Sequence, residues 1–145
     1  MLLASIAWAA PSETPVTVKV APAKVKAGKS GTVAVTISIA SGWHIFAEKP
    51  LVEGVRPSSL AIVAPRGLTL TVKMPAAKKV HLDALKKDAN VYEGQVKATV
   101  VVAAAKDVPA GKQMLEGTLR YQACSEQTCL IPTKVTVKIP LEITK

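Results

Sequence analysis

Hydrophobic and polar residues alternate along most of the chain, which is the pattern of β-strands with one buried face. In "TVAVTISIA", residues 32–40, every second residue is Val or Ile, and the residues between them are Ala, Thr or Ser. Similar strand-like runs are "PVTVKV" (15–20), "LTLTVKM" (68–74), "YEGQVKATVVVA" (92–103), "QMLEGTLRYQA" (113–123) and "VTVKIPLEI" (135–143). The pattern predicts about seven short strands in antiparallel sheets.

Residues that favour turns separate these runs. They are Ala27-Gly28, Ser41-Gly42, Pro65-Arg66-Gly67 and Pro109-Ala110-Gly111. Short strands with regular turns predict an all-β fold, an immunoglobulin-like antiparallel β-sandwich. The order Cys, Trp, Cys of true immunoglobulin domains is absent, because Trp43 precedes both cysteines. We expect Trp43 to fill the core rather than to stack on a ligand.

One stretch does not alternate: "PAAKKVHLDALKKDAN", residues 75–90. Its polar residues and flanking breakers predict a long surface loop, with a short helical turn around Val80 to Leu85. Loops of this length in compact domains are often functional lids.

The length of the chain and its first residues bound the domain organisation. The 145 residues fit one domain, which we place at residues 11–145. Residues 1–10 contain a short apolar run that closes in Ala7-Trp8-Ala9, the small-x-small pattern of signal cleavage sites. We interpret it as the remnant of a secretory signal, the alternative being a disordered tail or a cloning remnant. A run this short does not span a membrane, since that takes about 20 apolar residues.

The formal net charge of +9 raises the question of an anionic partner. The lysines are scattered singly or in pairs, however, and the whole chain holds five aromatic residues. This composition offers neither a clustered basic face nor a stacking platform for bases. We therefore expect no nucleic-acid partner.

The two cysteines, Cys124 and Cys129, are separated by four residues between two predicted strands. One interpretation is a structural disulfide. Closing a six-residue loop stabilises a protein by only about 2 kcal/mol on the chain-entropy estimate, whereas a loop of about fifty residues gives about 4. This comparison argues weakly against a purely structural bond.

A metal site is a second interpretation, with His44 and His81 joining the cysteines. The histidines lie far apart in the sequence and lack the spacing of zinc motifs. Met74 and Met114 occupy strand positions that look buried, so a copper thioether site is not indicated. We expect no metal or cofactor, and we expect both histidines to be ordinary surface or hydrogen-bonded residues.

Reversible thiol–disulfide exchange is the third interpretation. It needs two cysteines that can form a bond and a bond that a partner can reach. The loop contains Glu126 and no basic residue, although Arg120 and Lys134 flank it. Such a pair predicts a slow attacking thiol, suited to a relay in which a partner's activated thiolate opens the disulfide.

Three stretches, in the right order, carry a resemblance to a known family. These are "YQACSEQTCLIP" with Tyr121, Gln122, Cys124, Cys129 and Pro132, "SGWHIFAEKP" with Gly42, Trp43, His44 and Ile45, and "NVYEGQVKATVVV" with Tyr92, Glu93 and Gly94. Over roughly residues 15–143 the chain resembles the N-terminal periplasmic domain of the thiol:disulfide interchange protein DsbD, also described as the disulfide bond corrector domain.

The resemblance implies a periplasmic immunoglobulin-like domain whose catalytic residues are Cys124 and Cys129. It implies electrons arriving from a membrane electron-transfer module through a thioredoxin-like domain. They would pass on to periplasmic disulfide isomerases or to thiol proteins of cytochrome c maturation. A cap loop shields the pair in the family, and residues 79–90 occupy the corresponding stretch, with "HLDAL" where the family has an aromatic residue. Leu130 and Ile131 separate the second cysteine from Pro132.

Two further expectations complete the prediction. Alternation from Leu119 and Tyr121 places Cys124 on the opposite face, so we expect it to face a partner and to be attacked first. We expect a monomer. The alternative function is an extracytoplasmic immunoglobulin-like binding module whose disulfide is inert.

Overall fold

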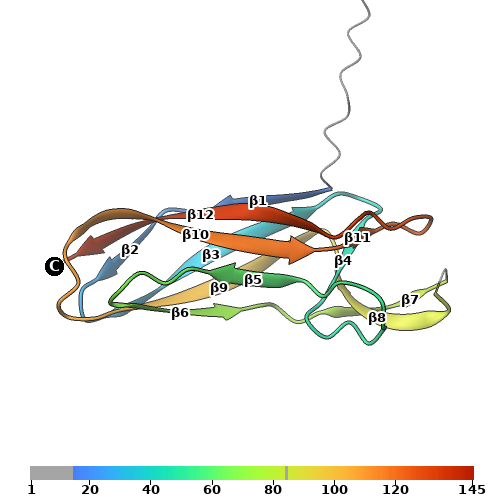
Figure 1. Ribbon diagram of the computed structural model, residues 1–145, viewed down its shortest axis with the longest axis horizontal. Helices are drawn as coiled ribbons and strands as arrows, with labels where there is room; N and C mark the ends of the chain where they lie inside the picture. Colours follow the sequence, from blue (N-terminus) through green and yellow to red (C-terminus); the bar gives the residue numbers. More distant parts are fainter. Residues whose placement is uncertain (1–14, 84) are drawn as a thin grey trace, which may run out of the picture.

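The computed structural model describes residues 15–83 and 85–145, which form an immunoglobulin-like β-sandwich (Figure 1). The prediction for residues 1–10 lies outside the described residues. No helix occurs in the described ranges, and the strands number twelve rather than about seven. They are β1 (Val16–Val20), β2 (Ala23–Lys26), β3 (Ser30–Ile39), β4 (His44–Phe46), β5 (Ser59–Ile62), β6 (Leu68–Lys73), β7 (Lys78–Leu82), β8 (Lys87–Tyr92), β9 (Gln95–Ala104), β10 (Gly111–Tyr121), β11 (Ala123–Cys124) and β12 (Thr133–Thr144).

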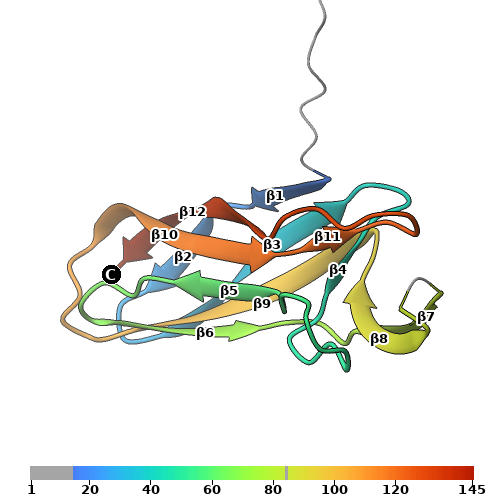
Figure 2. The ribbon, with the colours of Figure 1, turned by 45° about the vertical axis from the view of Figure 1, so that its right-hand side comes forward.

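Two four-stranded sheets make the sandwich. One has the order β1-β3-β9-β6 and the other β2-β12-β10-β5. The long strands β10 and β12 pair antiparallel from Gly111↔Ile143 to Tyr121↔Thr133, and β3 pairs with β9 over nearly its whole length. The two sheets lie face to face along the long axis of the molecule (Figures 1 and 2).

The alternating residues of these strands form the main core. On β3 the inward residues from Val33 to Ile39 are at most 6% exposed, as the sequence predicts. Burying each such side chain contributes roughly 1.5–3 kcal/mol. The predicted burial of Met114 is wrong: its exposed fraction is 54%, because its neighbour Leu115 takes the inward position on β10. Met74 and Trp43 are half-buried and pack against the main core, as expected for Trp43.

One strand pair departs from the predicted antiparallel arrangement. The first β segment of the chain splits at Ala21-Pro22, and Pro22 has no N–H to donate to a sheet. The part before it, β1, pairs antiparallel with β3, whereas β2 pairs parallel with β12. The proline therefore lets the chain cross from one sheet to the other.

A third sheet of short strands, in the order β11-β4-β8-β7, extends from one end of the sandwich (Figures 1 and 2). Its presence corrects the prediction of a long loop at residues 75–90. Most of this stretch is the β7–β8 hairpin, and Val80–Leu82 are strand rather than helical turn. Val80 and Leu82 alternate with polar residues and are half-buried, so the period-two signal was present but short.

Candidate functional site

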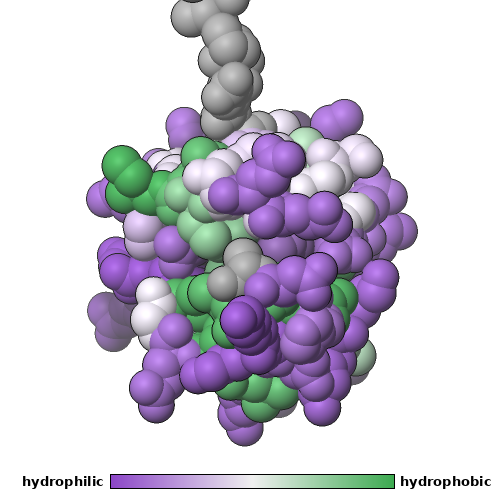
Figure 3. Space-filling view, turned by 90° about the vertical axis from the view of Figure 1, so that its right-hand side faces the viewer, coloured by the Kyte–Doolittle hydropathy of each residue, from purple (hydrophilic) through white to green (hydrophobic). Residues whose placement is uncertain are grey.

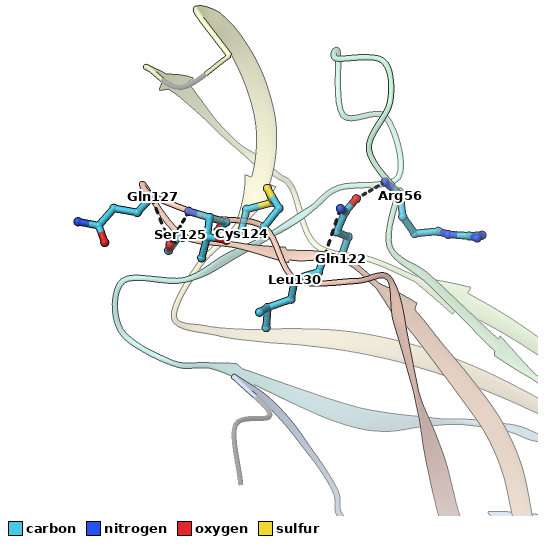
Figure 4. Close-up of a disulfide and its surroundings, with 8 residues drawn as sticks. Arg56, Gln122, Cys124, Ser125, Gln127 and Leu130 are labelled. Atoms are coloured by element: carbon cyan, nitrogen blue, oxygen red, sulfur yellow. Dashed lines mark hydrogen bonds between the residues drawn. A yellow bond between two sulfur atoms is a disulfide. The ribbon is translucent and has the colours of Figure 1, made fainter. Parts of the chain in front are cut away.

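The two cysteines form a disulfide at the neck of a tight turn after β11 (Figure 4). Cys124 and Cys129 are directly opposite each other in an antiparallel bridge, with Cα atoms 4.0 Å apart. Backbone hydrogen bonds flank the pair on both sides: Ser125 N donates to Thr128 O at 2.7 Å, and Leu130 N donates to Ala123 O at 2.8 Å. These backbone bonds thus hold the two cysteines opposite each other.

The hydroxyl of Ser125 completes this turn. Its Oγ accepts hydrogen bonds from the backbone N–H groups of Gln127 at 3.2 Å and Thr128 at 3.1 Å. A serine that hydrogen-bonds N–H groups two and three residues ahead stabilises turns of this kind. Ser125 therefore shapes the loop that carries Cys129.

The two sulfur-bearing residues differ in burial. Cys124 is 2% exposed, whereas Cys129 is exposed. The expectation that Cys124 faces a partner is wrong. Ala123 continues the inward face of β10 into the main core, and Cys124 does lie on the opposite side, but a second hydrophobic cluster covers that side. An incoming thiolate therefore reaches the sulfur of Cys129 more readily than that of Cys124.

We call this second cluster the small cluster. It consists of buried Phe46, Val52, Ala89, Val91 and Cys124, with Val55, Val80 and Leu82 packed against it. Two segments supply its cover: the β7–β8 hairpin, and the connection between β4 and β5 that carries Val52 and Val55. The predicted cap at residues 79–90 contributes to this cover as a hairpin.

Backbone and side-chain hydrogen bonds attach the β4–β5 connection to the third sheet. Asn90 of β8 donates from its backbone N to Pro50 O at 2.9 Å and from Nδ2 to Lys49 O at 3.0 Å. Ala47 N donates to Asn90 O at 2.9 Å, and Ser58 N donates to Phe46 O at 3.0 Å. These bonds hold in place the connection that carries Val52, which belongs to the small cluster together with Cys124.

Gln122, from the cysteine motif, links this connection to the disulfide loop (Figure 4). Its Oε1 accepts a hydrogen bond from Arg56 N at 2.9 Å, and its Nε2 donates to Leu130 O at 3.3 Å. One side chain thereby joins the β4–β5 connection to the residue that follows Cys129.

His44 lies beside the disulfide and is not a surface residue. It is 6% exposed and opposes Cys124 in the β11–β4 register. Its ring meets that of Phe46 edge to face, with centroids 5.5 Å apart. Its Nε2 is buried without a hydrogen-bond partner. Burial lowers the pKa of His44, and the charge of Glu93 opposes that shift in part.

His81, by contrast, is hydrogen-bonded as expected. Its Nδ1 lies 2.9 Å from Oδ1 of Asp88 across the β7–β8 hairpin. The structure therefore does not bring His44 and His81 into one site with the cysteines. In residues 15–83 and 85–145, no group of three or more His, Cys, Asp or Glu side chains is arranged to hold a metal ion.

A groove of about 750 Å³ runs alongside the disulfide loop. Its walls include Trp43, His44, Glu93 and Glu126. The turns at Gly42 and Gly94, two motif glycines with φ of 82° and 66°, form one side of it. These left-handed conformations favour glycine, which explains their place in the motifs.

The motif tyrosines have a structural role. Tyr121 is 2% exposed within the main core, and burial raises its pKa. Tyr92 is 4% exposed, and its hydroxyl donates to Pro75 O at 3.0 Å. Burial, followed by the charge of Glu48, raises the pKa of Tyr92. Tyr92, on β8 of the third sheet, therefore fixes that sheet onto the main core, and Tyr121 fills the same core from β10.

The end of the molecule that carries the third sheet has a mixed surface, with hydrophobic residues visible between hydrophilic ones (Figure 3). The β4–β5 connection, the β7–β8 hairpin and the stretch after Cys129 each expose a large hydrophobic side chain: Leu51, Leu85 and Ile131, at 58%, 43% and 83%. Over the described part of the chain, no helix has the length and apolar character needed to cross a membrane.

Sequence reasoning found the cysteine pair but missed its buried surroundings. Val52 and Gln122 were not predicted as site residues, and His44 was expected to be ordinary. The sequence "WHIF" did indicate part of this arrangement. Residues two apart in a strand lie on the same face, so His44 shares a face with Phe46. The contact with Cys124 depends on a pairing about eighty residues away in sequence, which periodicity does not reveal.

Comparison with known proteins identifies similar chains. Residues 12–141 match the protein family described as "Thiol:disulfide interchange protein DsbD, N-terminal". The structure is similar to the N-terminal periplasmic domain of ScsB from Proteus mirabilis, with 16% identity and a TM-score of 0.65 over 90% of this chain. The match covers 48% of the ScsB chain, so this chain spans about half of that length.

A second similar structure is the N-terminal domain of DsbD from Neisseria meningitidis in the reduced form. It has 21% identity and a TM-score of 0.48, and the match covers 78% of this chain and 79% of that one. No curated protein sequence matches the chain.

Proposed function

Because the chain belongs to the family of N-terminal domains of the thiol:disulfide interchange protein DsbD, we propose that Cys124 and Cys129 are the residues through which it exchanges disulfides. Family membership supports thiol–disulfide interchange in general. The observation that carries the assignment to these residues is the disulfide itself, with Cys129 exposed and Cys124 buried at the end of the sandwich.

The burial difference orders the steps. A partner thiolate attacks Sγ of Cys129, a bond forms between the two sulfurs, and the Cys124–Cys129 bond breaks with its electron pair left on Cys124. The partner's second thiol then attacks the partner sulfur that is bonded to Cys129, and the Cys129 sulfur leaves as a thiolate. The partner dithiol is oxidised to a disulfide, and this chain is reduced to the dithiol, with two protons passing to its sulfurs.

The electron donor we propose is a thioredoxin-like domain fed by a membrane electron-transfer module. The acceptors are periplasmic disulfide isomerases or thiol proteins of cytochrome c maturation, and the compartment is the periplasm. The exposed Leu51, Leu85 and Ile131, on the segments that carry or adjoin the third sheet and the disulfide loop, support a docking face, because the cores of protein interfaces are rich in apolar groups. Disulfides persist in this oxidising compartment.

Trapping tests the proposal. We expect the Cys124→Ser variant, whose Cys129 is first coupled to thionitrobenzoate, to form a mixed disulfide with a thioredoxin-like domain that lacks its resolving cysteine, with thionitrobenzoate as the leaving group. The Cys129→Ser variant should form it far more slowly, because Cys124 is buried. If neither variant forms a mixed disulfide and the unmodified chain is not reduced by the donor, the disulfide is inert and the binding-module alternative stands.

A further inference from the structure

Opening the disulfide creates an electrostatic problem at Cys124. When a thiolate attacks Cys129, the electron pair of the broken bond stays on the Cys124 sulfur. That sulfur belongs to the small cluster, where Phe46, Val52, Ala89 and Val91 supply only apolar contacts. A thiolate among such groups is destabilised because burial disfavours the charged form. A hydrogen-bond donor near this sulfur would lower the cost.

His44 is the polar side chain placed to supply that bond. It opposes Cys124 in the antiparallel pairing of β4 with β11. Residues in such a pair have their Cβ atoms about 5 Å apart on the same face of the sheet. Phe46, two residues on, contacts the His44 ring and also belongs to the small cluster, which places His44 and Cys124 on one side of the sheet.

The hydrogen bonding of His44 is incomplete while the disulfide is closed. Its side chain is 94% buried, since 6% is exposed, and Nε2 has no partner. A buried nitrogen without a hydrogen bond costs free energy, so the unpaired Nε2 destabilises the disulfide form. In the disulfide form, the unpaired Nε2 of His44 therefore lies beside Cys124. The Cys124 sulfur becomes charged only after the disulfide opens.

We propose, on the premise of the exchange function above, that His44 donates a hydrogen bond from Nε2 to the Cys124 sulfur once the disulfide has opened. The bond stabilises Cys124 as the leaving thiolate in the reductive step. It also favours the dithiol form at equilibrium, because it satisfies a donor that the disulfide form leaves unpaired. The proton that Cys124 finally takes up comes from the solvent, and His44 keeps its own proton throughout.

The charges around His44 suit a neutral donor. Glu93, after β8, and Glu126, in the disulfide loop, line the same groove. Lys78 of β7 lies 3.2 Å from the Glu93 carboxylate and offsets its charge. Burial lowers the pKa of His44 against the opposing effect of Glu93, which favours a neutral ring near neutral pH. The proposed bond uses the tautomer with the proton on Nε2.

The experiment measures the Cys124 thiol directly, in the Cys129→Ser background where it is the single cysteine. Thiolate absorbance is followed against pH with His44 intact, with His44→Gln, which keeps a donor, and with His44→Leu, which removes it. We expect His44→Leu to lower the acid dissociation constant of the thiol about tenfold and His44→Gln to restore most of it. His81→Leu, at an exposed histidine of β7, is the matched control and should leave the constant unchanged.

The intact disulfide gives a second readout. In His44→Leu the equilibrium with a dithiol buffer should shift about tenfold toward the disulfide, which corresponds to about 30 mV. Equal effects of Leu and Gln in both measurements, or no effect of either, would overturn the proposal and leave His44 a packing residue. A chain that no thioredoxin-like donor reduces would instead refute the exchange function, and the thiol titration would still report on His44.

Discussion

The main core and the small cluster are two hydrophobic regions that differ in the length and pairing of the strands beneath them. The central strands around the main core, β3, β9, β10 and β12, have 10 to 12 residues and pair along most of their lengths. The small cluster lies on strands of 2 to 6 residues and depends on one loop and one hairpin for cover. Regions held by few backbone pairs open at a lower free-energy cost than the core of a sheet. The molecule thus places its disulfide where local opening leaves the sandwich intact.

The largest expected effect of this division is on the disulfide itself. Replacing Cys129 with Ser should abolish disulfide exchange altogether, and should lower the free energy of unfolding by only about 2 kcal/mol, the value of a six-residue loop. Turnover with a thioredoxin-like donor and urea unfolding measure the two quantities. A loss of folding in this variant would show that the sandwich depends on the bond, against the comparison drawn above.

In the main core, Ile37→Ala should reduce the free energy of unfolding by about 2–5 kcal/mol, because Ile37 is 0% exposed and its loss leaves a cavity. The reduction potential of the folded protein should not change. Thr32→Ala, at an exposed position of the same strand, is the control and should cost less than about 0.5 kcal/mol. A shifted potential in Ile37→Ala would mean that the two regions are coupled.

In the small cluster, Val52→Ala should cost about 1–2 kcal/mol, since Val52 is 8% exposed and loses packing against the cluster. It should also raise the rate at which Cys124, as a single cysteine, reacts with an alkylating reagent. Its neighbour Leu51 is 58% exposed, so Leu51→Ala should change neither quantity. Equal alkylation rates in the two variants would show that Val52 does not shield the sulfur.

The difference between the regions also explains what the sequence could predict. The long strands carry four or more alternating positions each, so the sandwich and residues such as Val35 and Ile139 followed from periodicity. The strands of the third sheet are short: β7 alternates over only five residues, and β8 reads "KDANVY", which begins with two exposed charged residues. Its hairpin was therefore predicted as a loop.

The candidate site shows the same limit. The cysteines and their family motif were evident in the sequence, but which sulfur is buried depends on Val52 and on the hairpin, which are distant in sequence. The face of Cys124 was predicted correctly and its exposure was not, because alternation tells which side a residue takes and not what covers that side.

An effect of similar size on stability, without a change in the hydrophobic clusters, is expected at Gln122, which links the β4–β5 connection to the disulfide loop. Gln122→Ala removes two hydrogen bonds and should cost about 1–2 kcal/mol. Amide hydrogen exchange at Arg56, whose N–H donates to the Gln122 side chain, should become faster, while exchange on β3 stays slow. Unchanged exchange at Arg56 would contradict the role assigned to Gln122.

The smallest expected effect is a pH dependence of stability from His44. Burial lowers its pKa in the folded chain below the ordinary value of 6.5, so the unfolded chain binds the proton at a higher pH. Its contribution to stability is complete above about pH 6.5 and is lost as the pH falls through the lowered pKa of the folded state. Urea unfolding from pH 8 to pH 5 should show this loss, and His44→Gln should reduce it. If His81→Gln removed the loss of stability at low pH instead, the pH dependence would come from the β7–β8 hairpin rather than from His44.

The reduction potential of the Cys124–Cys129 pair tests the central claim most directly. The chain is equilibrated with a thioredoxin-like dithiol or with glutathione buffers of defined potential, and the dithiol fraction is counted by thiol alkylation and mass spectrometry. A pair that exchanges disulfides should have a potential less negative than about −300 mV and should reach equilibrium with the thioredoxin-like donor. A potential well below that value, with no reaction with the donor, would make the disulfide structural and contradict the account.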